Sequence, residues 1–252
     1  MNTPVEERPT PSLSRRLLTE FVGTALLLIA IVGSGIAAQN LSPDNTGLEL
    51  LENAIATGAA LVAIILAVGA VSGAHLNPIV SSVDVLLGGL RSRDLAPYIG
   101  AQVVGGVVGV LLANLMFALT PVSISTHVRS SPSLWLSEIL ATFGLLLVIF
   151  GLSRTGRASA APFAVGAYIT GAYFFTSSTS FANPAVTLAR TLSNTFAGIA
   201  PESVPSFIVA QCLGAVVALG ALRVLWPSER LRTSAAEAVV PHTAVEAGVS
   251  DD

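Results

Sequence analysis

The stretch that decides the fold is FANPAVTLAR, residues 181–190, which lies in an apolar part of the chain and has a counterpart in SGAHLNPIV, residues 72–80. Asn is among the best N-cap residues of a helix. Pro loses nothing at the first helical position, because the N–H there has no intrahelical partner. Each Asn-Pro pair therefore predicts a helix start. The apolar pieces that follow, near 78–88 and 184–195, can cross only about half of a ~30 Å hydrocarbon core.

The composition points to a membrane protein. The 252-residue chain is 52% hydrophobic and only 11% charged, and its mean hydropathy is +0.76. A soluble surface needs more charge, whereas helices of about 20 apolar residues cross a bilayer without it. We expect an all-α fold of six transmembrane helices plus two re-entrant half-helices, with the six spans near 15–38, 52–71, 98–119, 134–153, 161–177 and 206–226.

The charged residues indicate the orientation. All 12 basic residues are Arg, and most precede the first span, follow the last, or lie in the loops after the second and fourth spans. The positive-inside rule makes that side cytoplasmic. We therefore expect an inner (plasma) membrane protein with both termini in the cytoplasm. The opposite loops carry the acids Asp44, Glu49 and Glu202, with Arg129 as the main basic exception.

Several classes of function are disfavoured. The net charge of −3 does not indicate the basic surface that nucleic-acid-binding proteins need. Cys212 is the only cysteine, and neither a Cys/His cluster nor a nucleophile–base pair suggests a metal, a cofactor or an enzyme.

The chain repeats itself. LLTEFVGTALLL (17–28) matches WLSEILATFGLLL (135–147), and AQVVGGVVGV (101–110) matches AQCLGAVVAL (210–219). With the Asn-Pro motifs, these features recur in one order at nearly one separation. We expect a polar arm over 1–14, a channel domain over 15–228 with repeats near 15–120 and 133–228, and a disordered cytoplasmic tail over 229–252. Because each repeat has three spans, the second must be inverted relative to the first.

In such an inverted repeat the two Asn-Pro tips meet near the membrane centre. Non-helical backbone at that depth must be buried or line a water-filled cavity. Two facing helix N-termini make a positive maximum there, and the amides of Asn77 and Asn183 can donate hydrogen bonds into the lumen. This arrangement admits neutral hydroxylated solutes and opposes cations and protons.

With these motifs, the inverted repeat and a Glu near the start of two spans, the chain resembles the aquaporin (major intrinsic protein) family over about residues 15–228. The resemblance implies a passive channel for small neutral solutes, with a pore in each subunit of a homotetramer in the lipid bilayer. FTSSTSFANPAVTLAR, residues 175–190, is similar to aquaglyceroporin-like bacterial members associated with arsenic resistance. This similarity implies glycerol-like polyols, metalloid acids such as arsenite, and water as solutes.

The chain departs from the family pattern at its filter. The first family motif is normally Asn-Pro-Ala, but Ile79 follows Asn77 and Pro78. The second is normally Asn-Pro-Ala-Arg, but Val186 follows the run of Asn183, Pro184 and Ala185. The resemblance places the other filter positions at Thr57, Ser180 and either Gly171 or Tyr173, although these side chains could also be ordinary packing residues. We expect a wide constriction without the usual Arg.

Arg190 follows Asn183 by seven residues, and seven steps of ~100° return to nearly the same helix face. This spacing predicts a relocated charge in the outer vestibule. The alternative is a helix-end Arg paired with headgroups, acids or the helix dipole.

Five further residues are expected to support the loops. Glu20 and Glu138 either accept hydrogen bonds from re-entrant backbone N–H groups or relay protons. His75 either satisfies loop carbonyls or gates with pH, and Gln102 and Gln211 are expected to support the half-helices. The competing functions are a secondary transporter that uses Glu20 and Glu138, a strict water channel, and a closed scaffold.

Overall fold

The computed structural model describes residues 11–227. The first ten residues of the predicted arm and the whole predicted tail, 229–252, lie outside these. The described chain is helical, without strands, and its helices are α1 (Leu13–Leu41), α2 (Thr46–Ser72), α3 (Pro78–Leu87), α4 (Ser92–Met116), α5 (Pro132–Arg154), α6 (Ala161–Phe175), α7 (Pro184–Ala189) and α8 (Val204–Leu225).

Among residues 11–227, five helices are long and apolar enough to cross a membrane, namely α1, α2, α4, α5 and α8. The sixth predicted span is α6, which has only 15 residues and a length of ~22 Å. It follows a 3-10 turn at Ala158–Ala160 and packs between α2 and α5.

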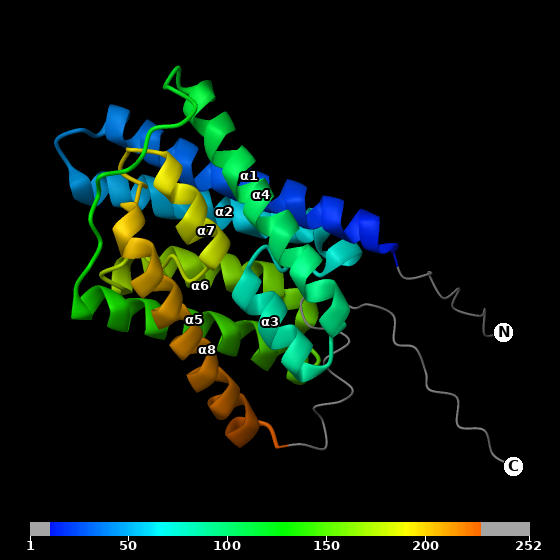
Figure 1. The fold of residues 1–252 in the computed structure, drawn as a ribbon. Helices are drawn as coiled ribbons and strands as arrows, with labels where there is room; N and C mark the ends of the chain where they lie inside the picture. Colours follow the sequence, from blue (N-terminus) through cyan, green and yellow to red (C-terminus); the bar gives the residue numbers. More distant parts are fainter. Residues whose placement is uncertain (1–10, 228–252) are drawn as a thin grey trace, which may run out of the picture.

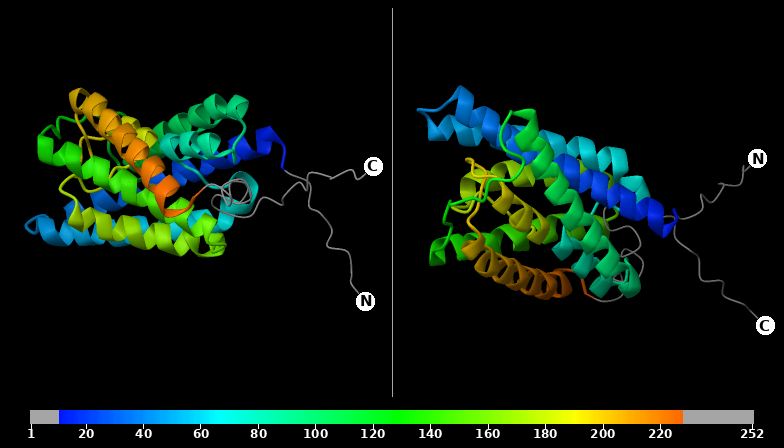
Figure 2. Two further views of the ribbon diagram at one scale, coloured as in Figure 1. Left: turned by 90° about the horizontal axis from the view of Figure 1, so that it is seen from below. Right: turned by 45° about the horizontal axis from the view of Figure 1, so that its top comes forward.

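The two repeats pack in the same way. In the first, α1 contacts α2 and α4, and in the second α5 contacts α6 and α8, while α2 and α6 join the halves. Figure 1 shows α4 crossing α1 and α8 crossing α5, with the short α3 and α7 held between the long helices. In Figure 2 the start of α1 and the end of α8 lie toward the same end of the molecule, as an even number of spans requires.

Glycines allow the crossing helices to touch. A Cβ at Gly105 or Gly109 of α4 would collide with a backbone carbonyl of α1, and a Cβ at Gly214 of α8 would collide with a carbonyl of α5. A Cβ at Gly100 of α4 or Gly220 of α8 would meet no other atom within 4 Å, so these two glycines are not needed for helix contacts within residues 11–227.

Candidate functional site

Both Asn-Pro pairs start a half-helix, as predicted. Asn77 Oδ1 accepts the backbone N–H of Ile79 at 2.9 Å, and Asn183 Oδ1 accepts those of Ala185 at 2.9 Å and Val186 at 3.3 Å. Pro78 and Pro184 occupy the first turns. Both Ile79 and Ala185 are buried behind the tips.

The second half-helix is shorter than the predicted 184–195. It ends at Ala189 and continues as a 3-10 turn over Arg190–Leu192. The carbonyls of Thr191 and Leu192 accept N–H groups of Ser125 and Ser123 in the α4–α5 connection. The chain therefore leaves the helix axis to pair with that loop.

The two tips are joined through their Asn side chains. Asn77 Nδ2 donates to the carbonyl of Ala182 at 2.8 Å, and Asn183 Nδ2 donates to that of Leu76 at 2.7 Å. Both acceptor residues have a positive φ, 51° at Leu76 and 48° at Ala182, which an L-residue rarely adopts. Since an amide carries two N–H donors, one on each Asn stays available for the lumen.

The first loop is held by one buried carboxylate. Glu20 accepts hydrogen bonds from the Ser72 hydroxyl at 2.6 Å and the His75 N–H at 3.0 Å through Oε1. Its Oε2 accepts the Leu76 N–H at 2.7 Å and the Gln102 amide at 2.8 Å. Four donors thus fix the loop that presents Asn77.

The second loop is held in the same way. Glu138 Oε1 accepts the Ser178 hydroxyl at 2.6 Å and the Phe181 N–H at 2.9 Å. Its Oε2 accepts the Ala182 N–H at 2.8 Å and the Gln211 amide at 2.7 Å. The supporting atoms of one half therefore repeat in the other.

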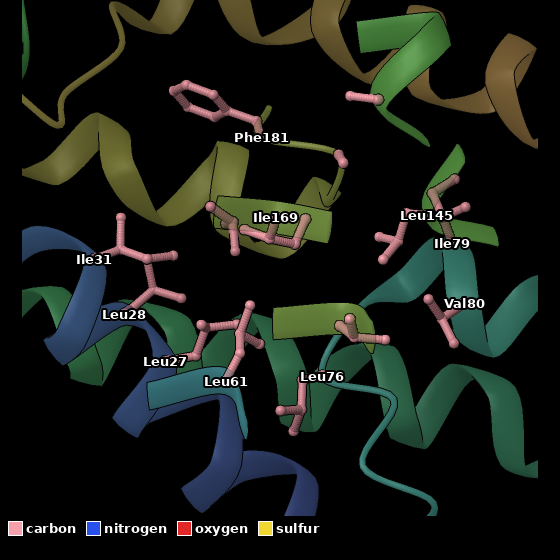
Figure 3. Close-up of a cluster of buried hydrophobic side chains, with 14 of the residues drawn as sticks. Leu27, Leu28, Ile31, Leu61, Leu76, Ile79, Val80, Leu145, Ile169 and Phe181 are labelled. Carbon is pink, nitrogen blue, oxygen red and sulfur yellow. The ribbon is translucent and has the colours of Figure 1, made fainter. Parts of the chain in front are cut away.

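A cavity runs along the two tips. Its walls come from α1, α2, α5, α6 and both loops. Figure 3 shows Leu27 and Ile31 of α1, Leu61 of α2, Ile169 of α6 and Phe181 around this region. Polar groups border the same space, from Asn77, Asn183, Thr57, Tyr173, Ser180, His75 and Arg190.

The filter positions lie together, with one correction. Tyr173, Thr57, Ser180 and Val186 all border the cavity. Gly171 does not and is exposed, because two helical steps turn it to the opposite face. Tyr173 OH lies 3.2 Å from Thr57 Oγ1. Of the two positions left open by the sequence, Tyr173 therefore faces the cavity and Gly171 does not.

Arg190 also borders the cavity, in line with the relocated charge that its spacing from Asn183 predicts. It is only 2% exposed, and its guanidinium carbon lies 3.6 Å from the ring centre of Phe181. Its Nε donates to the Ala197 carbonyl. Within residues 11–227 no carboxylate pairs with it, which leaves the acid-paired alternative without support.

His75 has partners other than the expected loop carbonyls. Its Nδ1 lies 3.0 Å from Ser81 Oγ, and its Nε2 lies 3.4 Å from Asp84 Oδ2. Sequence reasoning missed Asp84. The available signal was spacing, because Asp84 follows Asn77 by the same seven residues as Arg190 follows Asn183.

Comparison with known proteins decides the family. The sequence model of the major intrinsic protein family matches residues 7–180 and 160–250. The chain belongs to the major intrinsic protein family. It is therefore a membrane channel protein and not an enzyme.

Members of the family with assigned names are similar over most of the chain. "Aquaglyceroporin AqpS" of Rhizobium meliloti is 52% identical over 84% of this chain and 90% of its own length. A "Glycerol uptake facilitator protein" of Streptococcus pneumoniae is 32% identical over 63% of this chain and 74% of its own. The solved structure of the aquaglyceroporin from Plasmodium falciparum has a TM-score of 0.64 at 22% identity, covers 86% of this chain and 98% of its own, and supports the fold alone.

Proposed function

We propose that this member of the family conducts small uncharged hydroxylated solutes passively, namely glycerol-like polyols, arsenous acid and water. The observation that carries the proposal is the mixed lining of the cavity. Leu27, Ile31, Leu61 and Ile169 offer hydrocarbon, whereas Thr57, Tyr173, Ser180 and the two Asn residues offer hydrogen-bonding groups. A polyol carries both hydrocarbon and hydroxyl groups and can use both kinds of lining.

The filter adds donors where a solute must pass. Ser180 Oγ is buried without a hydrogen-bond partner among residues 11–227, and Arg190 borders the same space. Arg190 supplies the positive charge that the family usually places at the position of Val186. The smaller Val leaves room for a solute larger than water.

Exclusion of ions rests on the centre as well as on the filter. The N-termini of α3 and α7 meet at the Asn-Pro tips, where helix dipoles are positive. A cation or a proton is repelled there, while a neutral solute is not.

Two alternatives remain distinguishable. A strict water channel is favoured by the 3.2 Å contact between Thr57 and Tyr173, which narrows the filter. A secondary transporter that uses Glu20 or Glu138 is disfavoured, because both carboxylates are saturated with hydrogen bonds and neither borders the cavity.

We also propose a homotetramer in the inner (plasma) membrane with cytoplasmic termini. The support is the family resemblance and the Arg-rich loops on the side where α1 begins.

The test is stopped-flow light scattering on proteoliposomes, with water, glycerol and arsenous acid as solutes. We expect rapid, non-saturable uptake of all three, and Val186→Arg should slow glycerol and arsenous acid more than water. Fast water flux without solute uptake would establish the strict water channel. Saturable uptake against a gradient would establish the transporter, and no flux at all would favour a closed scaffold.

A further inference from the structure

The outer end of the cavity holds a guanidinium with unused donors. Arg190 is almost fully buried, and its Nε is bound to the Ala197 carbonyl. Among residues 11–227 no acceptor bonds its two terminal nitrogens. Because the side chain borders the cavity, these N–H groups are placed to meet whatever occupies the outer end.

A second buried guanidinium lies beside the first. Arg129 comes from the α4–α5 connection, is 9% exposed, and lies with its guanidinium carbon 5.3 Å from the ring centre of Phe181. It donates to the carbonyls of Gly198 at 2.9 Å and Phe196 at 3.2 Å. Both arginines are thus anchored on one short loop and gathered around one ring.

The protein balances this local charge only in part. Within residues 11–227 the ion pairs of arginine involve only Arg16, Arg91 and Arg93, all with Asp94. The charge of Glu138 reaches both Arg129 and Arg190, but a single carboxylate offsets only one of the two positive charges. Burial, then Arg129 and Arg190, lower the pKa of the nearby His127, and burial lowers the pKa of Arg129 to about 10.

Buried charges in proteins are normally paired, and buried donors normally have acceptors, so unused guanidinium donors that border a cavity suit an anionic ligand. We propose that the outer mouth is a binding site for a small anion, an oxyanion or a halide, which the terminal nitrogens of Arg190 hold and the charge of Arg129 attracts. An oxyanion suits the site best, because two guanidinium N–H groups bind two oxygens of one ion side by side. The bound ion occupies the filter and slows the uptake of neutral solutes.

The binding test does not depend on conduction. Full-length protein in detergent is heated with low-millimolar sodium sulfate or with sodium gluconate at equal ionic strength, and the midpoint of unfolding is followed. A bound ion raises that midpoint. We expect sulfate to raise it, Arg190→Gln to weaken sulfate binding about tenfold or more, and Arg129→Gln to weaken it a few-fold through lost charge attraction.

Two controls separate binding from general salt effects. Arg129→Lys keeps the charge and should recover most of the sulfate response. Arg154→Gln removes another buried Arg, one that caps the Leu222 carbonyl at the far end of α5, and should leave the response intact. An equal sulfate response in all variants, or none in the wild type, overturns the proposal. If Arg190→Gln does not fold, the comparison of Arg129→Gln with Arg129→Lys tests the proposal in its place.

A second measurement keeps this proposal apart from the proposed function. In proteoliposomes, external sulfate should slow glycerol uptake in the wild type and less in Arg129→Gln. Sulfate binding without any glycerol uptake would overturn the proposed function alone. Glycerol uptake with no sulfate response in either measurement would overturn the anion site alone.

Discussion

The two re-entrant loops share their supports and differ in the charges that they carry. Glu20 and Glu138 each accept four hydrogen bonds from matching donors. Beside the first loop the ring of His75 lies against the carboxylate of Asp84. Beside the second, at the equivalent positions, the ring of Phe181 lies against the guanidinium of Arg190.

The difference shows which parts of a duplicated scaffold tolerate change. Side chains that accept buried backbone N–H groups are the same in both repeats, because leaving such a group unsatisfied costs about 1–3 kcal/mol. Groups at the other loop positions are free to diverge, and here the residue seven positions after each Asn is Asp84 in the first half and Arg190 in the second. The predictions below test first the shared supports and then the charges.

The largest effect is expected at the two carboxylates. Glu20→Gln and Glu138→Gln should each destabilise the protein by about 2–6 kcal/mol, because an amide nitrogen faces two donors that need an acceptor and each unsatisfied donor costs about 1–3 kcal/mol. The measurement is the unfolding midpoint in detergent, with the exposed Glu202→Gln as a control that stays at the wild-type value. A large loss in only one of the two would show that the supports are not equivalent.

A smaller effect is expected at the helix crossings. Gly109→Ala and Gly214→Ala place a methyl against a backbone carbonyl of the partner helix and should each cost about 1–3 kcal/mol. Gly220→Ala meets open space and should not destabilise. The same unfolding assay applies, and a loss at Gly220 equal to that at Gly109 would refute the packing argument.

The next effect concerns proton leak and the charged residues Arg190 and Asp84. Arg190→Gln removes the positive group at the filter and should raise proton leak roughly tenfold, on the order of one charge interaction. Asp84→Asn leaves that group in place and should not raise the leak. A pH-sensitive dye inside proteoliposomes measures both, and equal leaks from the two variants would mean that Arg190 is no barrier.

The smallest effect concerns pH. The pKa of His127 is lowered by burial and by Arg129 and Arg190, so the imidazole is neutral at pH 7 and gains a proton only as the pH falls below its ordinary range near 6.5. Sulfate binding should then strengthen by a few-fold at acid pH. His127→Gln should abolish that increase, and an unchanged pH profile in this variant would exclude His127 as its source.

Much of the fold could be predicted because it rests on short-range rules. Asn and Pro mark helix starts wherever they stand in an apolar run, and the repeat with its odd number of spans fixes the inversion. The end of α7 could not be predicted, because it depends on Ser123 and Ser125, which are distant in sequence. The sequence could not decide whether Tyr173 or Gly171 faces the cavity, because this depends on how α6 is rotated about its axis. Residues two positions apart on a helix point to nearly opposite sides.

The charges near the pore were only partly predictable. The seven-residue spacing found Arg190, and applied to the first motif it would have found Asp84. Spacing could not show that Phe181 and Arg129 lie beside Arg190, since Arg129 comes from the connection between the repeats.

The central claim is that both halves line one conduction path. Val80 and Val186 stand at equivalent places after the two Asn residues and both border the cavity, whereas Val216 is exposed on α8. The most direct measurement is glycerol uptake by proteoliposomes that carry Val80→Trp, Val186→Trp or Val216→Trp, each first shown to be folded. The account predicts that the first two variants lose most of the uptake and the third keeps it. Wild-type uptake in either Val80→Trp or Val186→Trp would contradict a path that passes both tips.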